Sequence, residues 1–161
     1  MTRTLIAGIG NPDRGDDGVG PAVIAALGDR LPDGTRAIPL RGDLLPLLDA
    51  WARTDRIVLV DACDECGAPG RIHRLHNPVA EELPPEAPTS SHALGVAETL
   101  ALARALAEPA AAGPDVVVYA VEGACFDFGA PLSPQVAAAI APLAEQIAAD
   151  VATDVAAPGP R

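Results

Sequence analysis

The chain has 161 residues, 49% hydrophobic and 20% charged, which predicts a single globular domain with its own core. Its formal net charge of −11 argues against a nucleic-acid partner and against binding to an anionic membrane, because both need clustered basic residues. The sequence opens without a signal-peptide pattern, we identify no apolar run of membrane-spanning length, and three cysteines are too few for a disulfide framework, so we expect a cytoplasmic protein without membrane insertion.

The stretch from Thr4 to Gly20, TLIAGIGNPDRGDDGVG, begins as a short apolar run and turns abruptly into glycine, asparagine, proline and aspartate. Such a run is typical of a buried strand, and residues 19–31 have a helical composition, so we expect a strand, a tight loop and a helix. The usual dinucleotide-binding loop does not fit, because Asp13 stands where that loop needs its third glycine. In α/β proteins this junction, at the carboxyl end of a strand, is where the chemistry is placed.

Two adjacent acids, Asp16 and Asp17, end this loop at the start of the predicted helix. Neighbouring carboxylates repel each other unless a cation or hydrogen-bond donors compensate, so the pair favours a functional site. We expect one acid to cap the helix and the other to point into a cleft. Asn11, in the same loop, is a candidate for binding substrate.

The rest of the chain alternates between strands and helices. We expect strands at 36–40, 56–62, 71–75 and 115–121 and helices at 44–52, 90–106 and 134–151, with a disordered tail at 152–161 after a single domain at 1–151. This order predicts a three-layer α/β fold, with about five strands in a twisted, mostly parallel sheet and helices on both faces. The strand at 71–75 follows its predecessor without a helix, so it must pair antiparallel or lie at an edge.

Two carboxylates stand at the ends of predicted strands. Asp61 ends the apolar run RIVLVDA, and since a core position would not hold a carboxylate, a functional role is a better interpretation than a turn-forming aspartate. Glu122 follows the strand at 115–121 in the same way, and we expect it to line the same cleft and to bind substrate.

A C-x-x-C pair, Cys63 and Cys66, precedes His73 and His76. A structural zinc site is not favoured, because the spacing differs from that of zinc fingers and the two histidines would point to opposite faces of a strand. A redox pair is not favoured either, because the segment leads into a glycine–proline turn and not into a helix. We interpret the cysteines as free thiols in a loop near the cleft.

His92 follows two serines at the predicted start of the third helix, where the helix dipole disfavours a charged imidazole. A neutral imidazole can accept a metal or a proton, although a plain surface histidine is the alternative. Asp17, Asp61 and His92 together supply two carboxylates and one imidazole without a fourth protein ligand. This set describes an open divalent-metal site that suits nickel or zinc better than magnesium or calcium.

Four motifs in order resemble those of the hydrogenase maturation endopeptidases. They are GIGNPDRGDDGVG at 8–20, VDA at Val60–Ala62, S-H-x-L-G at Ser91–Gly95 and DFG-x-x-LSP at Asp127–Pro134. The resemblance implies that Asp17, Asp61 and His92 bind the metal. Many members of that family carry glutamate at the first of these positions, and Asp17 is one methylene shorter.

The resemblance also implies a function. Such enzymes remove the C-terminal tail of the large-subunit precursor of a nickel–iron hydrogenase once nickel is in place, so nickel borne by the precursor, or another divalent transition metal, is the expected ion. Water is the expected nucleophile, with Asp16 or Asp17 as general base. Two alternatives are a chaperone-like module that binds metal or precursor without cutting, and a hydrolase of small molecules.

Overall fold

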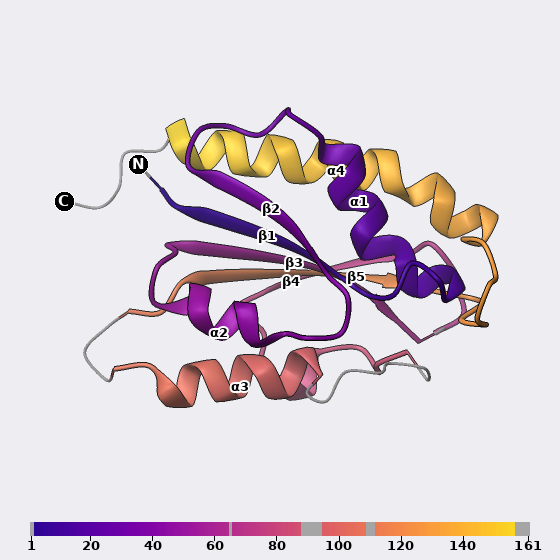
Figure 1. Cartoon of the computed structure of the whole chain (residues 1–161), viewed down its shortest axis with the longest axis horizontal. Helices are drawn as coiled ribbons and strands as arrows, with labels where there is room; N and C mark the ends of the chain where they lie inside the picture. The colour runs from indigo at the N-terminus through magenta and orange to yellow at the C-terminus, as the bar shows by residue number, and fades with distance from the viewer. Residues whose placement is uncertain (1, 65, 88–94, 109–111, 157–161) are drawn as a thin grey trace.

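A computed structural model of the chain describes residues 2–64, 66–87, 95–108 and 112–156. Its strands are β1 (Thr4–Ile9), β2 (Thr35–Leu40), β3 (Arg56–Cys63), β4 (Ile72–His76) and β5 (Asp115–Glu122). They form one sheet in the order β2-β1-β3-β5-β4, parallel throughout except for the antiparallel pair β4–β5 (Figure 1). The predicted α/β class is confirmed, and so is the antiparallel edge strand.

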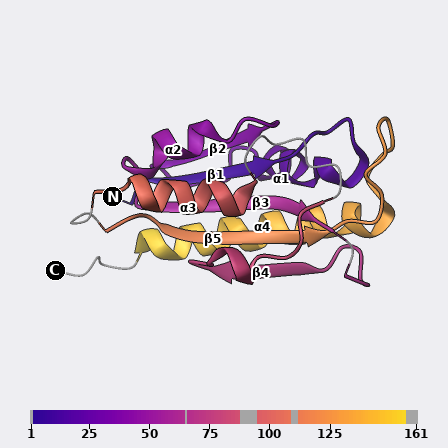
Figure 2. The ribbon, with the colours of Figure 1, turned by 90° about the horizontal axis from the view of Figure 1, so that it is seen from below.

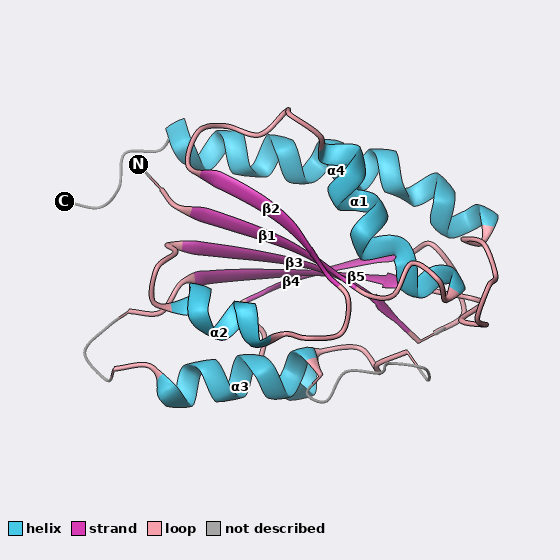
Figure 3. Ribbon diagram, viewed as in Figure 1, coloured by secondary structure: helices cyan, strands magenta, loops and turns pink. Residues whose placement is uncertain are grey.

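Helices cover both faces of the sheet. They are α1 (Val19–Leu27), α2 (Leu45–Trp51), α3 (Val96–Leu106) and α4 (Pro134–Ala156), with short 3₁₀ helices η1 (Gly15–Gly18) and η2 (Ala80–Glu82). Figure 3 shows α1 and α4 on one face and α2 and α3 on the other. The buried side chains divide into two clusters accordingly, one on each face, and this confirms the three layers.

Aliphatic side chains make most of both clusters. The central strand β3 contributes an unbroken buried run from Ile57 to Val60, as expected for a strand covered on both faces. Pro39 lies in β2, where the missing amide is tolerated because β2 is an edge strand.

Glycines allow α1 to start very close to the sheet. A Cβ added to Gly20 would lie 2.3 Å from the Ile9 carbonyl oxygen and 2.7 Å from that of Val60. A Cβ on Gly8 would lie 2.3 Å from the Gly20 carbonyl oxygen. The glycines of the first motif therefore bring the start of α1 against β1 and β3, a role beyond that of turn residues.

Helix ends differ from the prediction in two places. Helix α1 ends at Leu27 because Gly28 follows with φ of 52°, four residues before the predicted end at Leu31. Helix α4 continues to Ala156, five residues past the predicted end at Val151. Leu31 still packs against the core from the loop that follows α1.

Helix α4 is long and strongly apolar. By length and composition alone, residues 134–153 could cross a membrane. In the fold, one side of this helix is buried: Val136, Leu143 and Ile147 are at most 1% exposed and belong to the cluster shared with α1 and the sheet. Burial in the domain core therefore accounts for these apolar residues.

Candidate active site

The carboxyl ends of β1 and β3 form the switch point of the sheet. The two strands are parallel neighbours, but the chain leaves β1 towards β2 on one side and leaves β3 towards β4 and β5 on the other. Open α/β sheets form a crevice at such a point. Here the first loop (residues 10–18, between β1 and α1) and the second loop (residues 123–133, between β5 and α4) lie at the same end of the sheet (Figures 1 and 2).

Asp61 lies near the end of β3 and is half-buried. Its Oδ1 accepts the Ala62 amide hydrogen at 2.9 Å. Burial raises the pKa of Asp61 well above the ordinary value of an aspartate, and repulsion from Asp17, with a smaller contribution from Glu86, adds to the rise. Asp17 and Asp61, 44 residues apart in sequence, lie in η1 and β3, which contact each other in the fold.

Asp17 is only 2% exposed, and its Oδ2 accepts the Asn11 amide hydrogen at 2.7 Å. The Asn11 side-chain oxygen in turn accepts the Asp13 amide hydrogen at 2.9 Å. The expectation that one of the paired acids caps the helix is wrong, because Gly18 is the N-cap of α1 and no side chain bonds there. Asn11 and Asp17 instead hold the first loop closed on itself.

Asp16 is fully buried and binds the second loop. Its Oδ2 accepts the amide hydrogens of Ala124 at 2.8 Å and Cys125 at 3.0 Å and the Ser133 hydroxyl at 2.9 Å, and its Oδ1 accepts the Ser133 amide hydrogen at 2.7 Å. Two backbone bonds, from Gly15 to Ala130 and from Asp16 to Cys125, reinforce the junction. The neighbour of Asp17 thus ties the two loops into one unit.

Glu122 does not reach the cleft with Asp61 as predicted. Its carboxylate is fully buried beneath the β3–β4 loop, where it accepts the Ala68 amide hydrogen at 2.9 Å and contacts His73 Nε2 at 2.7 Å. The hydrogen bond from His73 is the main cause that lowers the pKa of Glu122; the amides of Ala68 and Cys66 also lower it, and burial opposes them. Glu122 therefore anchors this loop.

His73 and His76, for which a zinc site was not favoured, have different partners in the fold. His76 pairs with Asp115, away from the Glu122 partner of His73. Cys63 and Cys66 are free thiols, as interpreted from the sequence. Burial raises the pKa of Cys63 to about 12, so this thiol stays protonated and is a poor nucleophile at neutral pH.

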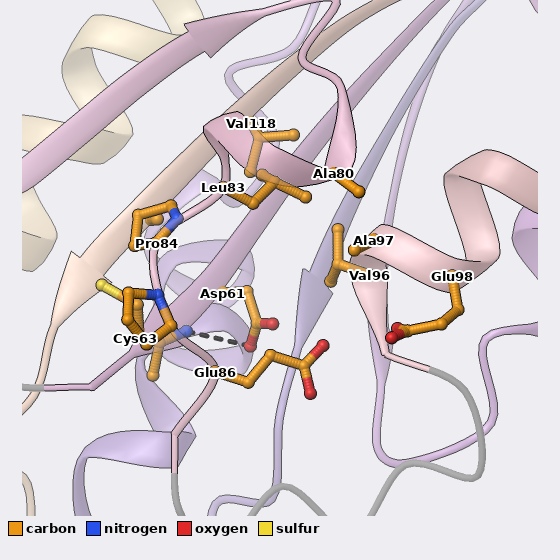
Figure 4. Close-up of a pocket in the computed structure, with 13 residues that line it drawn as sticks. Asp61, Cys63, Ala80, Leu83, Pro84, Glu86, Val96, Ala97, Glu98 and Val118 are labelled. Carbon is orange, nitrogen blue, oxygen red and sulfur yellow. Dashed lines mark hydrogen bonds between the residues drawn. The ribbon is translucent and has the colours of Figure 1, made fainter.

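A pocket of about 250 Å³ opens beside Asp61 (Figure 4). Its walls come from β3, β5, η2, α3 and the loop at 83–86 and are mostly apolar, and the carboxylates of Asp61, Glu86 and Glu98 lie along them. Neither glutamate was predicted as a site residue from the sequence. Glu86 belongs to a proline-rich loop without periodicity, and it is placed by a β-bridge to Cys63 that only the fold reveals.

His92 lies outside the described residues, in the gap at 88–94. The predicted start of the third helix at Ser90 is wrong for α3, which begins at Val96 because Gly95 is extended at φ −70° and ψ 176°. In the part of the chain that the structure describes, no three histidine, cysteine, aspartate or glutamate side chains are grouped to hold a metal. Of the three predicted metal ligands, Asp17 and Asp61 lie in the described part of the chain.

The fold and the site define an α/β protein with an acidic centre at the switch point of its sheet. A family model described as hydrogenase maturation protease matches residues 41–150, and the chain belongs to this family of endopeptidases. The resemblance inferred from the four motifs is thereby confirmed.

Solved structures agree with this assignment. The hydrogenase maturating endopeptidase HybD of Escherichia coli superimposes with a TM-score of 0.78 and 26% identity, over 94% of this chain and 93% of that one. The [NiFe] hydrogenase maturation protease HybD of Thermococcus kodakarensis gives 0.70 and 26%, over 96% and 99%. An E. coli endopeptidase solved in solution gives 0.74 and 27%, over 90% and 89%. No curated protein sequence matches the chain.

Proposed function

We propose that this chain removes the C-terminal tail from the large-subunit precursor of a nickel–iron hydrogenase, in the cytoplasm, after nickel has been inserted. The observation that carries the proposal is the position of two acids at the switch point, the buried Asp17 in η1 and the half-buried Asp61 in the neighbouring strand β3, in a chain of the hydrogenase maturation protease family. Two carboxylates held together in a partly buried site destabilise the fold unless a cation lies nearby, so the site is suited to a substrate that brings a cation.

Nickel suits the donor set. Two carboxylates with one imidazole form an incomplete shell for a borderline divalent ion, and the missing ligands would come from the precursor that carries the nickel. Asp17 and Asp61 would supply the oxygens and His92 the nitrogen. The positive charge of the nickel would relieve the repulsion between the two acids, so docking is favoured when the precursor is loaded.

The hydrogen bonds of Asp16 and Asp17 support a different role for each of these two acids. Both oxygens of Asp16 are engaged by the second loop, so we assign Asp16 to holding that loop. Asp17, bonded to the Asn11 amide, is assigned to the substrate, as nickel ligand or as general base for the attacking water. Cys63 is protonated at neutral pH, which supports water over this thiol as the nucleophile.

Cleavage of purified precursor tests the proposal. Nickel-loaded precursor is incubated with wild type, Asp17→Ala, His92→Ala and the control Asp13→Ala, and tail release is followed by mass spectrometry. Asp13 is a matched control because it is an exposed acid of the same loop, paired with Arg41. We expect Asp17→Ala and His92→Ala to lose at least about 100-fold in rate, while Asp13→Ala stays within about 3-fold. Wild-type rates in the Asp17 and His92 variants would refute the assignment.

A further inference from the structure

Phe128 is the one aromatic side chain of this protein that is left open to solvent. The chain has four aromatic residues, and Trp51, Tyr119 and Phe126 are at most 9% exposed, whereas Phe128 is 74% exposed. Scattered exposed leucines need no explanation, but an aromatic ring held out beside an active site is typical of a binding contact.

The ring is presented by a rigid turn. Residues 127–130 form a β-turn in which the Ala130 amide bonds to the Asp127 carbonyl at 3.2 Å and Gly129 has φ of 80°, as in type II turns. The Gly129 amide also bonds to the Asp13 carbonyl at 2.7 Å, across to the first loop. Little ordering is therefore needed when a partner covers Phe128.

Arg14 extends the same surface. Its guanidinium lies over the Phe128 ring, 5.7 Å from the ring centre, in cation–π contact. Within the described residues, Arg14 forms no ion pair. The pair, which we call the Phe128–Arg14 platform, offers an apolar face and a positive charge on a protein whose net charge is −11.

The platform is continuous with the candidate active site. Arg14 belongs to the first loop, its carbonyl accepts the Asp17 amide hydrogen at 3.1 Å, and Asp16 binds both flanks of the second loop. A folded protein that brings its peptide to Asp17 would therefore lie next to these two loops. Figure 2 shows them side by side at the carboxyl end of the sheet.

We infer that the Phe128–Arg14 platform is the docking contact for the hydrogenase precursor, which would cover the ring with an apolar side chain and pair Arg14 with a carboxylate. This inference rests on the proposed function for the identity of the partner. Because the contact is made away from the reacting bond, it contributes to binding of precursor more than to the chemical step.

The test compares Phe128→Ser with Leu106→Ser, Phe128→Tyr and wild type. Leu106 is a matched control, since it is 69% exposed and ends α3 at the opposite end of the molecule (Figure 1). Two quantities are measured for each protein: the Kd for immobilised nickel-loaded precursor, and kcat and KM for tail release. A thermal melt checks that each variant folds.

We expect Phe128→Ser to raise Kd and KM at least about 10-fold with kcat within about 2-fold, and Phe128→Tyr and Leu106→Ser to match wild type. If wild type cleaves and Phe128→Ser binds equally well, the docking role is overturned while the proposed function stands. If wild type binds without cleaving and Phe128→Ser binds more weakly, docking is supported and the protease function fails. A wild type that neither binds nor cleaves overturns both.

Discussion

Removal of the Asp16 carboxylate is expected to destabilise the protein severely. Asp16→Ala leaves three backbone amides and the Ser133 hydroxyl without their acceptor, all at a junction that is at least partly buried. Each buried donor left unpaired costs about 1–3 kcal/mol, and water that enters from the surface offsets part of the sum, so we expect a loss of about 3–5 kcal/mol. For a chain of this length that corresponds to a fall in Tm of about 6–20 °C.

Asp16→Asn should fall between wild type and alanine. The amide oxygen can keep the three bonds at Oδ2, but its NH₂ group then faces the Ser133 amide hydrogen, which costs about 1–3 kcal/mol. Urea unfolding followed by circular dichroism measures both variants, with Asp13→Ala as an exposed control that should stay within about 1 kcal/mol. Asp16→Ala within about 1 kcal/mol of wild type would refute the role assigned to this carboxylate.

Two further perturbations test the packing and the electrostatics. Gly20→Ala forces a methyl group against the Ile9 carbonyl oxygen and should lower the free energy of unfolding in urea by at least about 3 kcal/mol. In the control Gly42→Ala the added methyl group meets no atom within 4 Å, so the loss should be under about 1 kcal/mol. Equal losses in the two variants would contradict the close approach of α1 to the sheet. Glu122 has a pKa below its ordinary 4.5, so its contribution is present above about pH 4.5 and is lost as the pH falls through the folded-state pKa. Unfolding measured between about pH 6 and pH 3 should therefore show a steeper acid loss in wild type than in Glu122→Gln, and parallel curves would be inconsistent with the buried pair to His73.

The fold could be predicted because its signals are local. An aliphatic run such as Ile57–Val60 identifies a central strand by itself, and the short connection with its Pro69-Gly70 turn identifies the antiparallel edge strand that follows. Helix ends were less predictable. Gly28 ends α1 through a backbone conformation that competes with the stronger proline–glycine signal a few residues later.

The acidic residues of the site could be predicted from the sequence, but the different roles of Asp16 and Asp17 could not. Asp16 and Asp17 are equivalent in sequence, and what separates them is a set of donors 108 to 117 residues away along the chain. Glu122 was predicted at the cleft because it ends a strand, yet the loop that buries it is itself held by the Glu122 bonds to Ala68 and His73. Such mutual dependence leaves no local pattern in the sequence.

The ratio of tail-release rates for nickel-loaded and nickel-free precursor tests the central claim most directly. We predict that wild type releases the tail from the loaded precursor at least about 100-fold faster, because a bound nickel ion offsets the repulsion between Asp17 and Asp61 and completes the site. We also predict that this ratio falls towards one in Asp17→Ala. Equal release from both precursors by wild type would contradict nickel sensing by these residues.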